Sequence, residues 1–340
     1  MSKFHFATST SSQNRRDLFT IAHLTDIHYD LPRLQNFANF CNYINPLLNV
    51  KIITGDLVDQ PIDSEITECL SILKGDEIIV VGNHDKYAYG TYLTDSQIVQ
   101  KYNLSTNTNH AYYYVDFSDY KIRIICLNQF DIEGQTEYVT SELEHFSQEQ
   151  INWFVNTLHD SLNNNWNVIV SMHGAERHKN LQPNDKGFFQ RFNLWDDIVA
   201  YRCNGTPIAD IVDAFKNSKS INETYGYTDT SDTFSVNTSF NSHGKFIAYI
   251  CGHYHCNYIG YYKQYSDQLV ISTSCSAFYT NRNGMDFTTV QDDARFVGEK
   301  SEDCFHVYSI DLENSFVKVI RVGSTRNDRL EERTVAYYDF

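Results

Sequence analysis

Five short stretches of the chain place carboxylate, amide or imidazole side chains directly after a run of apolar residues. Such runs indicate buried strands, and the chemistry of α/β folds collects where strands end. The candidate metal ligands in these stretches are Asp26, His28, Asp56, Asn83, His173, His253 and His255. One such coincidence is common in an α/β protein, whereas five of them with the same kind of ligand indicate one shared site.

The seven candidate ligands are all oxygen or imidazole donors and include no thiolate. This donor set favours manganese, iron, zinc or similar ions over a soft-metal site or a purely calcium or magnesium site. Because a carboxylate can bridge two ions, seven residues suffice for two ions about 3.5–4 Å apart. Such a pair of ions activates a bound water and clamps the attacking and leaving oxygens of an in-line displacement, so the natural substrate is a phosphate ester.

The order and spacing of these residues resemble the calcineurin-like metallophosphoesterases. The motifs that match are Asp-x-His, Gly-Asp-x-x-Asp, Gly-Asn-His-Asp, a single His at a strand end, and Gly-His-x-His, and all five are intact over residues 18 to about 275. The resemblance implies that the first ion is held by Asp26, His28 and His255, the second by Asn83, His173 and His253, and that Asp56 bridges the two.

The resemblance also implies a catalytic pair outside the ligand set. His84 would protonate or stabilise the leaving oxygen, and Asp59 would hydrogen-bond to His84 and orient it. The implied reaction is hydrolysis of a phosphomonoester or phosphodiester by in-line attack of a water or hydroxide held by the metals. Protein Ser/Thr phosphatases fit less well, because that branch carries arginines in regions where this chain has Gln60 and Lys86.

Two alternatives stay open beside this hydrolase. One is a nuclease or cyclic-nucleotide phosphodiesterase of the same fold, and the other is a non-catalytic binding module that has kept the fold. The formal net charge of −16 argues against duplex nucleic acid as a partner, because duplex binding relies on Lys and Arg displacing counterions. A binding module is expected to have lost one or more ligands, and the sequence lacks none of the seven.

The composition indicates a globular protein of a reducing compartment. The chain of 340 residues is 41% hydrophobic and 21% charged, which excludes the disordered class. Its eight cysteines are scattered without a C-x-x-C pair, so we expect reduced thiols and a cytoplasmic location. No stretch approaches the length of a membrane span, and residues 1–17 lack the apolar region of an export signal. We expect residues 1–17 to be a disordered or flexible tail, and the oligomeric state is left open.

The apolar periodicity predicts an α/β fold: a two-sheet β-sandwich flanked by helices, in a single domain with long loops. We expect a metallophosphoesterase domain over residues 18–340 with an insert at 174–245, in which 216–244 is a polar loop; a second polar loop is expected at 280–303. Ser147 and Gln150 are spaced as a capping box that opens a helix. The last strands are expected to form a second sheet and lie near Tyr258–Tyr262, Leu269–Thr273, Phe305–Ile310 and Phe316–Val322.

Overall fold

The computed structural model describes most of the chain apart from both ends and several connecting segments. The described residues are 18–131, 144–176, 181–183, 203–227, 231–253, 255, 258–262, 264–273, 303–323 and 335–339. The predicted tail at 1–17 and the predicted loop at 280–303, apart from Asp303, lie outside these residues.

The helices alternate with strands in the first part of the chain, as the apolar periodicity predicts. The helices are α1 (Leu31–Ile44), the short 3-10 helix η1 (Asn45–Leu47), α2 (Asp63–Leu73), α3 (Asn83–Lys86), α4 (Asp95–Lys101), α5 (Gln148–Asn163) and α6 (Pro207–Asn217). Among the described residues, no helix is both long enough and apolar enough to cross a membrane.

The strands of the described residues form two large sheets. The first has the order β17 (Val335–Asp339), β16 (Phe316–Gly323), β15 (Cys304–Asp311), β1 (Leu18–Leu24), β2 (Val50–Ile53) and β3 (Glu77–Ile79). The second has the order β6 (Tyr113–Phe117), β7 (Ile122–Cys126), β8 (Asn167–Ser171), β12 (Lys245–Cys251), β14 (Tyr265–Ser272), β13 (Tyr258–Tyr262) and β9 (Leu181–Pro183). Two short hairpins complete the set, β4 (Tyr87–Ala88) with β5 (Thr91–Tyr92), and β10 (Ser220–Gly226) with β11 (Thr233–Ser239).

The chain starts with a β-α-β-α-β unit, in which β1, β2 and β3 pair in parallel with α1 and α2 as their crossovers, as the predicted α/β class requires. The expectation that the last strands form a second sheet is right for β13 and β14 and wrong for β15 and β16. Strands β13 and β14 join the sheet of β12, whereas β15 and β16 extend the sheet of β1. Strand pairing over such sequence separations is decided by tertiary packing, which local periodicity does not report.

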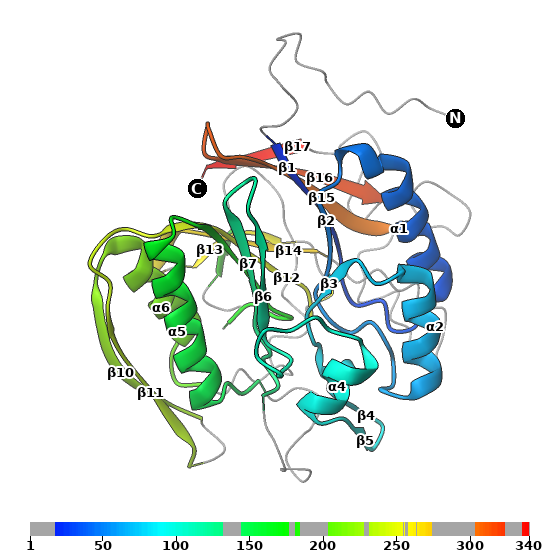
Figure 1. Cartoon of the computed structure of the whole chain (residues 1–340), viewed down its shortest axis with the longest axis horizontal. Helices are drawn as coiled ribbons and strands as arrows, with labels where there is room; N and C mark the ends of the chain where they lie inside the picture. Colours follow the sequence, from blue (N-terminus) through cyan, green and yellow to red (C-terminus); the bar gives the residue numbers. More distant parts are fainter. Residues whose placement is uncertain are drawn as a thin grey trace.

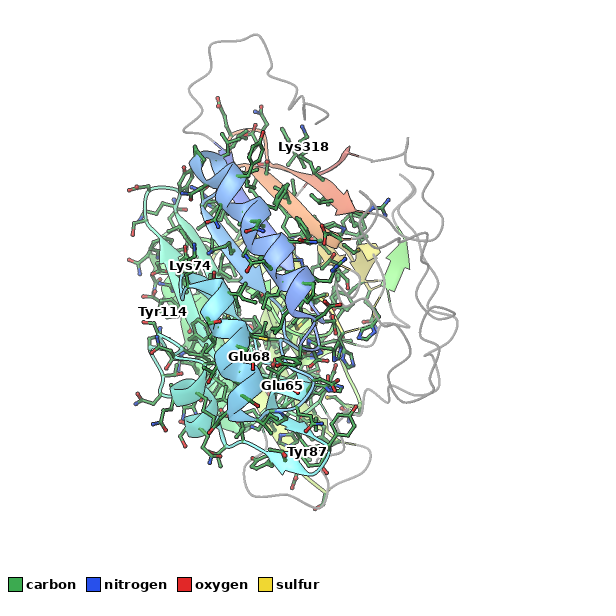
Figure 2. The ribbon with its side chains drawn as sticks, turned by 90° about the vertical axis from the view of Figure 1, so that its right-hand side faces the viewer. Glu65, Glu68, Lys74, Tyr87, Tyr114 and Lys318 are labelled. Carbon is green, nitrogen blue, oxygen red and sulfur yellow. The ribbon has the colours of Figure 1, made fainter. Side chains whose placement is uncertain are left out.

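The two sheets pack face to face as the predicted sandwich, with helices on both outer faces (Figure 1). Ile21 of β1 and Ile169 of β8 lie in the core between the sheets. Helices α1 and α2 cover the first sheet, side by side in Figure 2, where Glu65 and Glu68 mark α2. Helices α5 and α6 cover the second sheet. Because both faces of each sheet are buried, the central strands are nearly continuous apolar runs.

The predicted polar loop at 216–244 is wrong, because most of it is the hairpin β10–β11. The hairpin lies outside α5 and α6 (Figure 1) and buries Tyr225 and Phe234 against them. The outward positions hold Ser, Thr and Asn, such as the paired Asn222 and Asn237. A strand with small polar residues on its outer face contains few apolar residues, so its amino-acid composition resembles that of a loop.

The predicted capping box at the start of α5 is half present. The Ser147 side chain accepts a hydrogen bond from the Gln150 N–H, as a helix cap does. The Gln150 side chain is buried and donates to the Asn128 carbonyl at 2.8 Å and to Asp131 at 3.1 Å, and Asp131 accepts from the Ser147 N–H. Asp131 therefore takes the reciprocal role that the sequence pattern assigns to Gln150.

Candidate metal centre

The candidate ligands lie at one end of both sheets, where parallel strands stop. Asp26 and His28 follow β1, Asp56 follows β2, His173 follows β8, and His253 and His255 follow β12, while Asn83 begins α3 after β3. Strands β1 to β3 run parallel to one another, as do β7, β8 and β12. The carboxyl ends of parallel strands meet at one edge, which explains why motifs far apart in the sequence converge.

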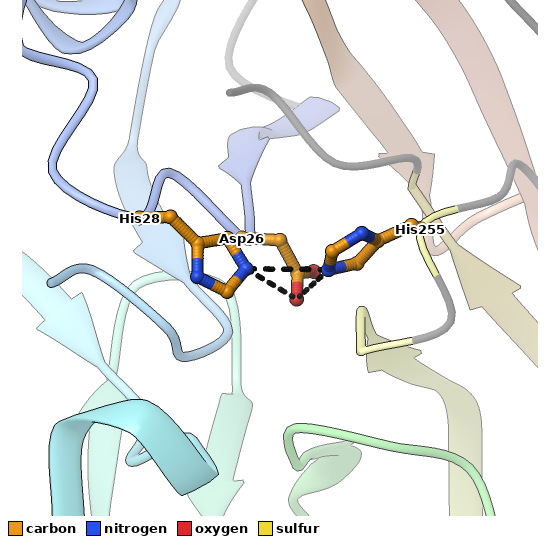
Figure 3. A group of neighbouring side chains, drawn as sticks. All are labelled: Asp26, His28 and His255. Atoms are coloured by element: carbon orange, nitrogen blue, oxygen red, sulfur yellow. Dashed lines mark hydrogen bonds and ion pairs between the residues drawn. The ribbon is translucent and has the colours of Figure 1, made fainter. Parts of the chain in front are cut away.

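Asp26, His28 and His255 form the first ligand group, shown in Figure 3. The Nε2 atoms of His28 and His255 are 3.2 Å apart, and Asp26 Oδ1 lies 3.2 Å from His255 Nε2 and 3.9 Å from His28 Nε2. One atom from each residue thus faces the same small volume, which fits an ion held by one carboxylate and two imidazoles.

Asp56, His173 and His253 form the second ligand group, with Asn83 beside it. His173 Nε2 lies 3.5 Å from Asp56 Oδ2, 3.0 Å from His253 Nδ1 and 3.1 Å from Asn83 Oδ1. The four atoms are again oxygen and imidazole donors that face one another. This donor chemistry matches that of the first group and fits the same class of borderline ions.

Asp56 stands between the two groups. Its Oδ2 atom is 3.5 Å from His173 Nε2 in the second group and 3.6 Å from His28 Nε2 in the first. A carboxylate in this place can contact an ion in either group, as a bridging ligand does in dinuclear sites.

Each ligand carboxylate has one oxygen held by the protein while the other faces the ligand groups. Asp26 Oδ2 accepts hydrogen bonds from Thr25 Oγ1 at 2.7 Å and from the His253 N–H at 2.9 Å. Asp56 Oδ1 accepts from the His84 N–H at 2.8 Å. Hydrogen bonds of this kind fix the orientation of a metal ligand before the ion arrives. Thr25 has no ligand pattern in the sequence, so its role shows only in the structure.

Five of the seven candidate ligands adopt a left-handed backbone. The φ angles are 51° for Asp26, 43° for His28, 52° for Asp56, 70° for His253 and 51° for His255. A residue with a side chain pays for this conformation, and such strain gathers at functional sites where the surrounding structure enforces it. The left-handed turns after β1, β2 and β12 direct the ligands that follow these strands towards the shared volume.

Two motif glycines permit the strand ends to approach this closely. A Cβ at Gly82 would overlap the Asp56 carboxylate and backbone, and a Cβ at Gly252 would overlap Thr25 and the Asp26 carboxylate. The Gly252 N–H also donates to the His173 carbonyl at 2.6 Å. The glycine in each motif is therefore a packing requirement of the ligand beside it.

The protonation states of most of the ligands already suit metal binding. Burial alone would raise the pKa of Asp26 and Asp56, but the neighbouring histidines lower both pKa values below the ordinary range, and the carboxyls are ionised. Burial lowers the pKa of His28 well below its ordinary value and that of His253 to about 3, which leaves both rings neutral. Burial also acts against a charged His173, but Asp56 and Asp26 outweigh it and raise the pKa to about 9. A bound cation would replace the His173 proton, since metal ligands bind deprotonated.

His84 and Asp59 lie beside the first ligand group. The His84 ring packs edge-on against the His28 ring with centroids 4.6 Å apart. Its Nδ1 atom lies 2.9 Å from the Asp59 backbone carbonyl and 4.0 Å from the carboxylate. The hydrogen bond expected from the Asp59 carboxylate is thus made by the Asp59 backbone. The carboxylate lies 3.9 Å from His28 Nδ1, beyond hydrogen-bond distance.

Asp85 organises the backbone around Asp56. Its carboxylate accepts the N–H groups of Asp56 at 2.8 Å, Leu57 at 3.0 Å and Gly82 at 2.8 Å, and the Tyr102 hydroxyl at 2.8 Å. Burial and the nearby Asp56 carboxylate raise the pKa of Asp85 to about 6. At neutral pH Asp85 is therefore an ionised acceptor that ties the loop after β2 to the loop after β3.

His23 is a core histidine, as its position inside a strand predicts. It is fully buried and its ring nitrogens lie 2.6 Å from the Tyr308 hydroxyl and 2.8 Å from Thr54 Oγ1. The Thr54 carbonyl in turn accepts a hydrogen bond from His173 Nδ1 at 2.6 Å. Nδ1 of His173 therefore carries a proton, and Nε2 is the nitrogen that faces Asp56. The hydrogen bond to the Thr54 carbonyl thus fixes the tautomer of His173.

Glu144 is a buried carboxyl near His173. Its side chain is 4% exposed, and no described residue hydrogen-bonds to either carboxyl oxygen. Burial raises its pKa to about 8, with a further contribution from Glu176. Glu176 accepts the N–H groups of Ile208 and Ala209 at the start of α6.

We predict that Glu144 makes stability fall as pH rises from about 4.5 to about 8, because the unfolded chain releases this proton first. Glu144→Gln removes this dependence, so its advantage in unfolding free energy grows to the order of a few kcal/mol by pH 8. Urea unfolding at pH 5 and pH 8.5 in the presence of a chelator measures this. The exposed Glu313→Gln is the control, and an advantage of Glu144→Gln that is equal at both pH values would refute the prediction.

The chain resembles known proteins in its sequence and in its fold. The family model for calcineurin-like phosphoesterases matches residues 19–257. The fold is similar to the crystal structure of a dimetal phosphatase from Danio rerio, with a TM-score of 0.56 and 11% identity, over 90% of this chain and 96% of that chain. It is also similar to GAP50, the anchor in the inner membrane complex of Plasmodium, with a TM-score of 0.46 and 12% identity, over 95% of this chain and 88% of that chain. No curated protein matches the sequence. At 11% identity the Danio rerio structure bears on the fold alone.

Proposed function

The chain belongs to the calcineurin-like phosphoesterase family, and from this premise we propose that it hydrolyses phosphate esters with the help of two metal ions. The observation that carries the proposal is the position of Asp56 Oδ2, within 3.6 Å of a histidine from each ligand group. When bound, two ions would make a water acidic enough to attack and would neutralise charge on the phosphoryl oxygens.

We propose that the ligands divide as the family resemblance implies. Asp26, His28 and His255 hold one ion, and Asn83, His173 and His253 hold the other, with Asp56 shared between them. The oxygen and imidazole donors support manganese, iron or zinc. The Asp26 and Asp56 carboxylates are oriented for binding cations. Hydrogen bonds from backbone N–H groups and from Thr25 hold one oxygen of each carboxylate and leave the other facing the ligand groups.

We propose that His84 donates the proton to the leaving oxygen. The Asp59 carbonyl can only accept, so His84 Nδ1 carries a proton and Nε2 is the atom free to exchange one with the substrate. The ring is partly exposed, at 23% of the side chain, so an ester can reach it. Asp59 holds the ring through its backbone carbonyl, 2.9 Å from Nδ1, and its carboxylate lies 4.0 Å from the same atom.

The test is hydrolysis of a nitrophenyl phosphomonoester and a nitrophenyl phosphodiester after loading with manganese, iron or zinc. Turnover of either ester supports the proposal, and the better substrate identifies the ester class. Metal binding without turnover of either ester would instead support a non-catalytic module. A single-stranded and a duplex oligonucleotide form a further arm; we expect no duplex cleavage, because the chain carries a net charge of −16.

We further propose a cytoplasmic location. The described residues include six buried cysteines, and burial raises the pKa of Cys41 to about 12, which keeps that thiol unreactive. Fractionation of cells that express the tagged chain tests the location, and recovery in an exported fraction would contradict it.

A further inference from the structure

Gln129 is a fully buried residue shortly after β7 and lies outside the metal-binding motifs. Its side-chain oxygen Oε1 accepts a hydrogen bond from the Gly174 N–H at 2.6 Å. Gly174 directly follows the candidate ligand His173. Gln129 therefore contacts the backbone next to a ligand, although no ligand pattern in the sequence includes it.

The peptide group between His173 and Gly174 is held at both ends. Its N–H is bound by Gln129, and its carbonyl, that of His173, accepts the Gly252 N–H at 2.6 Å. Gly252 directly precedes His253, whose Nδ1 atom lies 3.0 Å from His173 Nε2. Gln129 and Gly252 thus fix the orientation of one peptide group, which lies between the strand ends that carry two ligands of the second group.

The chain that carries Gln129 is itself fixed to α5. The Gln150 side chain accepts the Asn128 N–H at 2.8 Å and donates to the Asn128 carbonyl at 2.8 Å. Both residues are fully buried. A side chain that binds both backbone groups of a residue leaves it little freedom to move, so Gln129 extends from a rigid support.

The neighbouring Asn128 side chain reaches α3, the helix that begins with the ligand Asn83. Its Nδ2 atom donates to Asp95 Oδ1 at 3.1 Å, and the same oxygen accepts from Lys86 Nζ at 2.7 Å. Lys86 is the last residue of α3 and is buried. The contacts of residues 128 and 129 therefore lead to the segments that carry Asn83, His173 and His253, all of them in or beside the second ligand group.

The other end of the Gln129 amide is unpaired. Nε2 is buried, and no described residue accepts a hydrogen bond from it. An unpaired buried N–H destabilises a folded protein and offsets the gain from the bond that Oε1 makes. Packing alone would favour an apolar side chain of the same shape, so the amide is explained by the Gly174 N–H that its oxygen holds.

We propose that Gln129 is a positioning residue for the second ligand group, which keeps His173 and His253 in the arrangement that the second ion requires. The proposal rests on the proposed function, in which two ions share the site. Gln129 is not itself a ligand and acts through the peptide group after His173. Groups that orient a metal ligand in this way change metal affinity by about 10- to 100-fold.

The experiment compares Gln129→Met and Gln129→Glu with the unaltered chain in manganese titrations followed by electron paramagnetic resonance. Methionine has a similar shape and no acceptor for the Gly174 N–H, whereas glutamate keeps an acceptor oxygen in either protonation state. We expect Gln129→Met to weaken the binding of one ion per chain by about 10- to 100-fold and to leave the affinity for the other ion unchanged. The signal of an exchange-coupled manganese pair should then need more manganese to appear. Gln129→Glu should bind both ions as the unaltered chain does.

A stability measurement separates positioning from a structural role. Gln129→Met replaces one unpaired buried N–H, that of Nε2, by another, that of Gly174, so the Tm in the presence of a chelator should change little. The control is Gln100→Met at an exposed position of α4, which should change neither the Tm nor the affinity for either ion.

Three results would overturn the positioning role and leave phosphoester hydrolysis intact. The first is that Gln129→Met binds both ions as tightly as the unaltered chain, and the second is that it loses affinity for both ions equally together with a lower Tm. The third is that Gln129→Glu loses as much affinity as Gln129→Met. Binding of at most one ion by the unaltered chain would overturn the two-ion function and this proposal together.

Discussion

Asp56→Asn should remove metal from both ligand groups and lower phosphoester turnover by about 10³-fold or more. Asp56 is the carboxylate near both groups, with Oδ2 3.5 Å from His173 and 3.6 Å from His28. Asparagine keeps the shape and can still accept the His84 N–H, so the change removes charge rather than packing. The ions of a dinuclear site supply several kcal/mol of transition-state stabilisation, which corresponds to this loss in rate.

Elemental analysis and manganese titration of the Asp56→Asn variant check this prediction. The control is Asp119→Asn, which removes the same charge from an exposed turn and should leave both quantities unchanged. Loss of one ion with full retention of the other would show that Asp56 serves a single group. If the variant kept both ions and full turnover, the ions would be held by residues other than Asp56.

His84→Ala should lower turnover of an ester with a poor leaving group by about 10²–10⁴-fold, the usual range for a general acid. Metal content and fold should be unchanged, because the contact with Asp56 is made by the His84 backbone N–H, which alanine keeps. The loss should be smaller for a nitrophenyl ester, since a nitrophenolate leaves without a proton. Turnover of alkyl and nitrophenyl esters of the same phosphate class measures the difference.

The matched control for His84 is His243→Ala, another partly solvated histidine that bonds to a backbone carbonyl, that of Lys216. It should change neither turnover nor metal content. If His84→Ala loses metal, His84 is itself a ligand. If it loses the same factor on good and poor leaving groups, the ring acts by binding the phosphoryl oxygens and the proton-transfer assignment is wrong.

The sequence predicts this fold best where short-range patterns and strand order agree. Strand β1 coincides with the apolar run Leu18–Leu24, and the parallel start of the first sheet follows from alternating strands and helices. The ligand residues could be found because each follows an apolar strand, and parallel strands deliver their carboxyl ends to a common edge. Asp26 and His255 come together once β1 and β12 take their places in the first and second sheets.

The remaining features depend on contacts that no local pattern reports. Hairpin β10–β11 looked like a polar loop because its outer positions are Ser, Thr and Asn, while Tyr225 and Phe234 were too sparse to signal a buried face. The left-handed backbone of Asp26 and Asp56 is imposed by the surrounding structure, including the Asp85 carboxylate that binds the Asp56 N–H. Propensity alone predicts against that conformation.

The sequence also does not predict which atoms of Asp59 and His84 are in contact. Motif spacing places the two residues together, but whether the carboxylate or the carbonyl meets the ring depends on the backbone path after Val58.

The most direct test of two metal ions sharing one site is elemental analysis of the purified chain after equilibration with manganese and removal of loosely bound metal. The seven oxygen and imidazole ligands around Asp56 predict close to two ions per chain, near enough to give an exchange-coupled manganese pair in an electron paramagnetic resonance spectrum. At most one ion per chain after metal addition, or two ions with the spectrum of isolated manganese, would contradict the account.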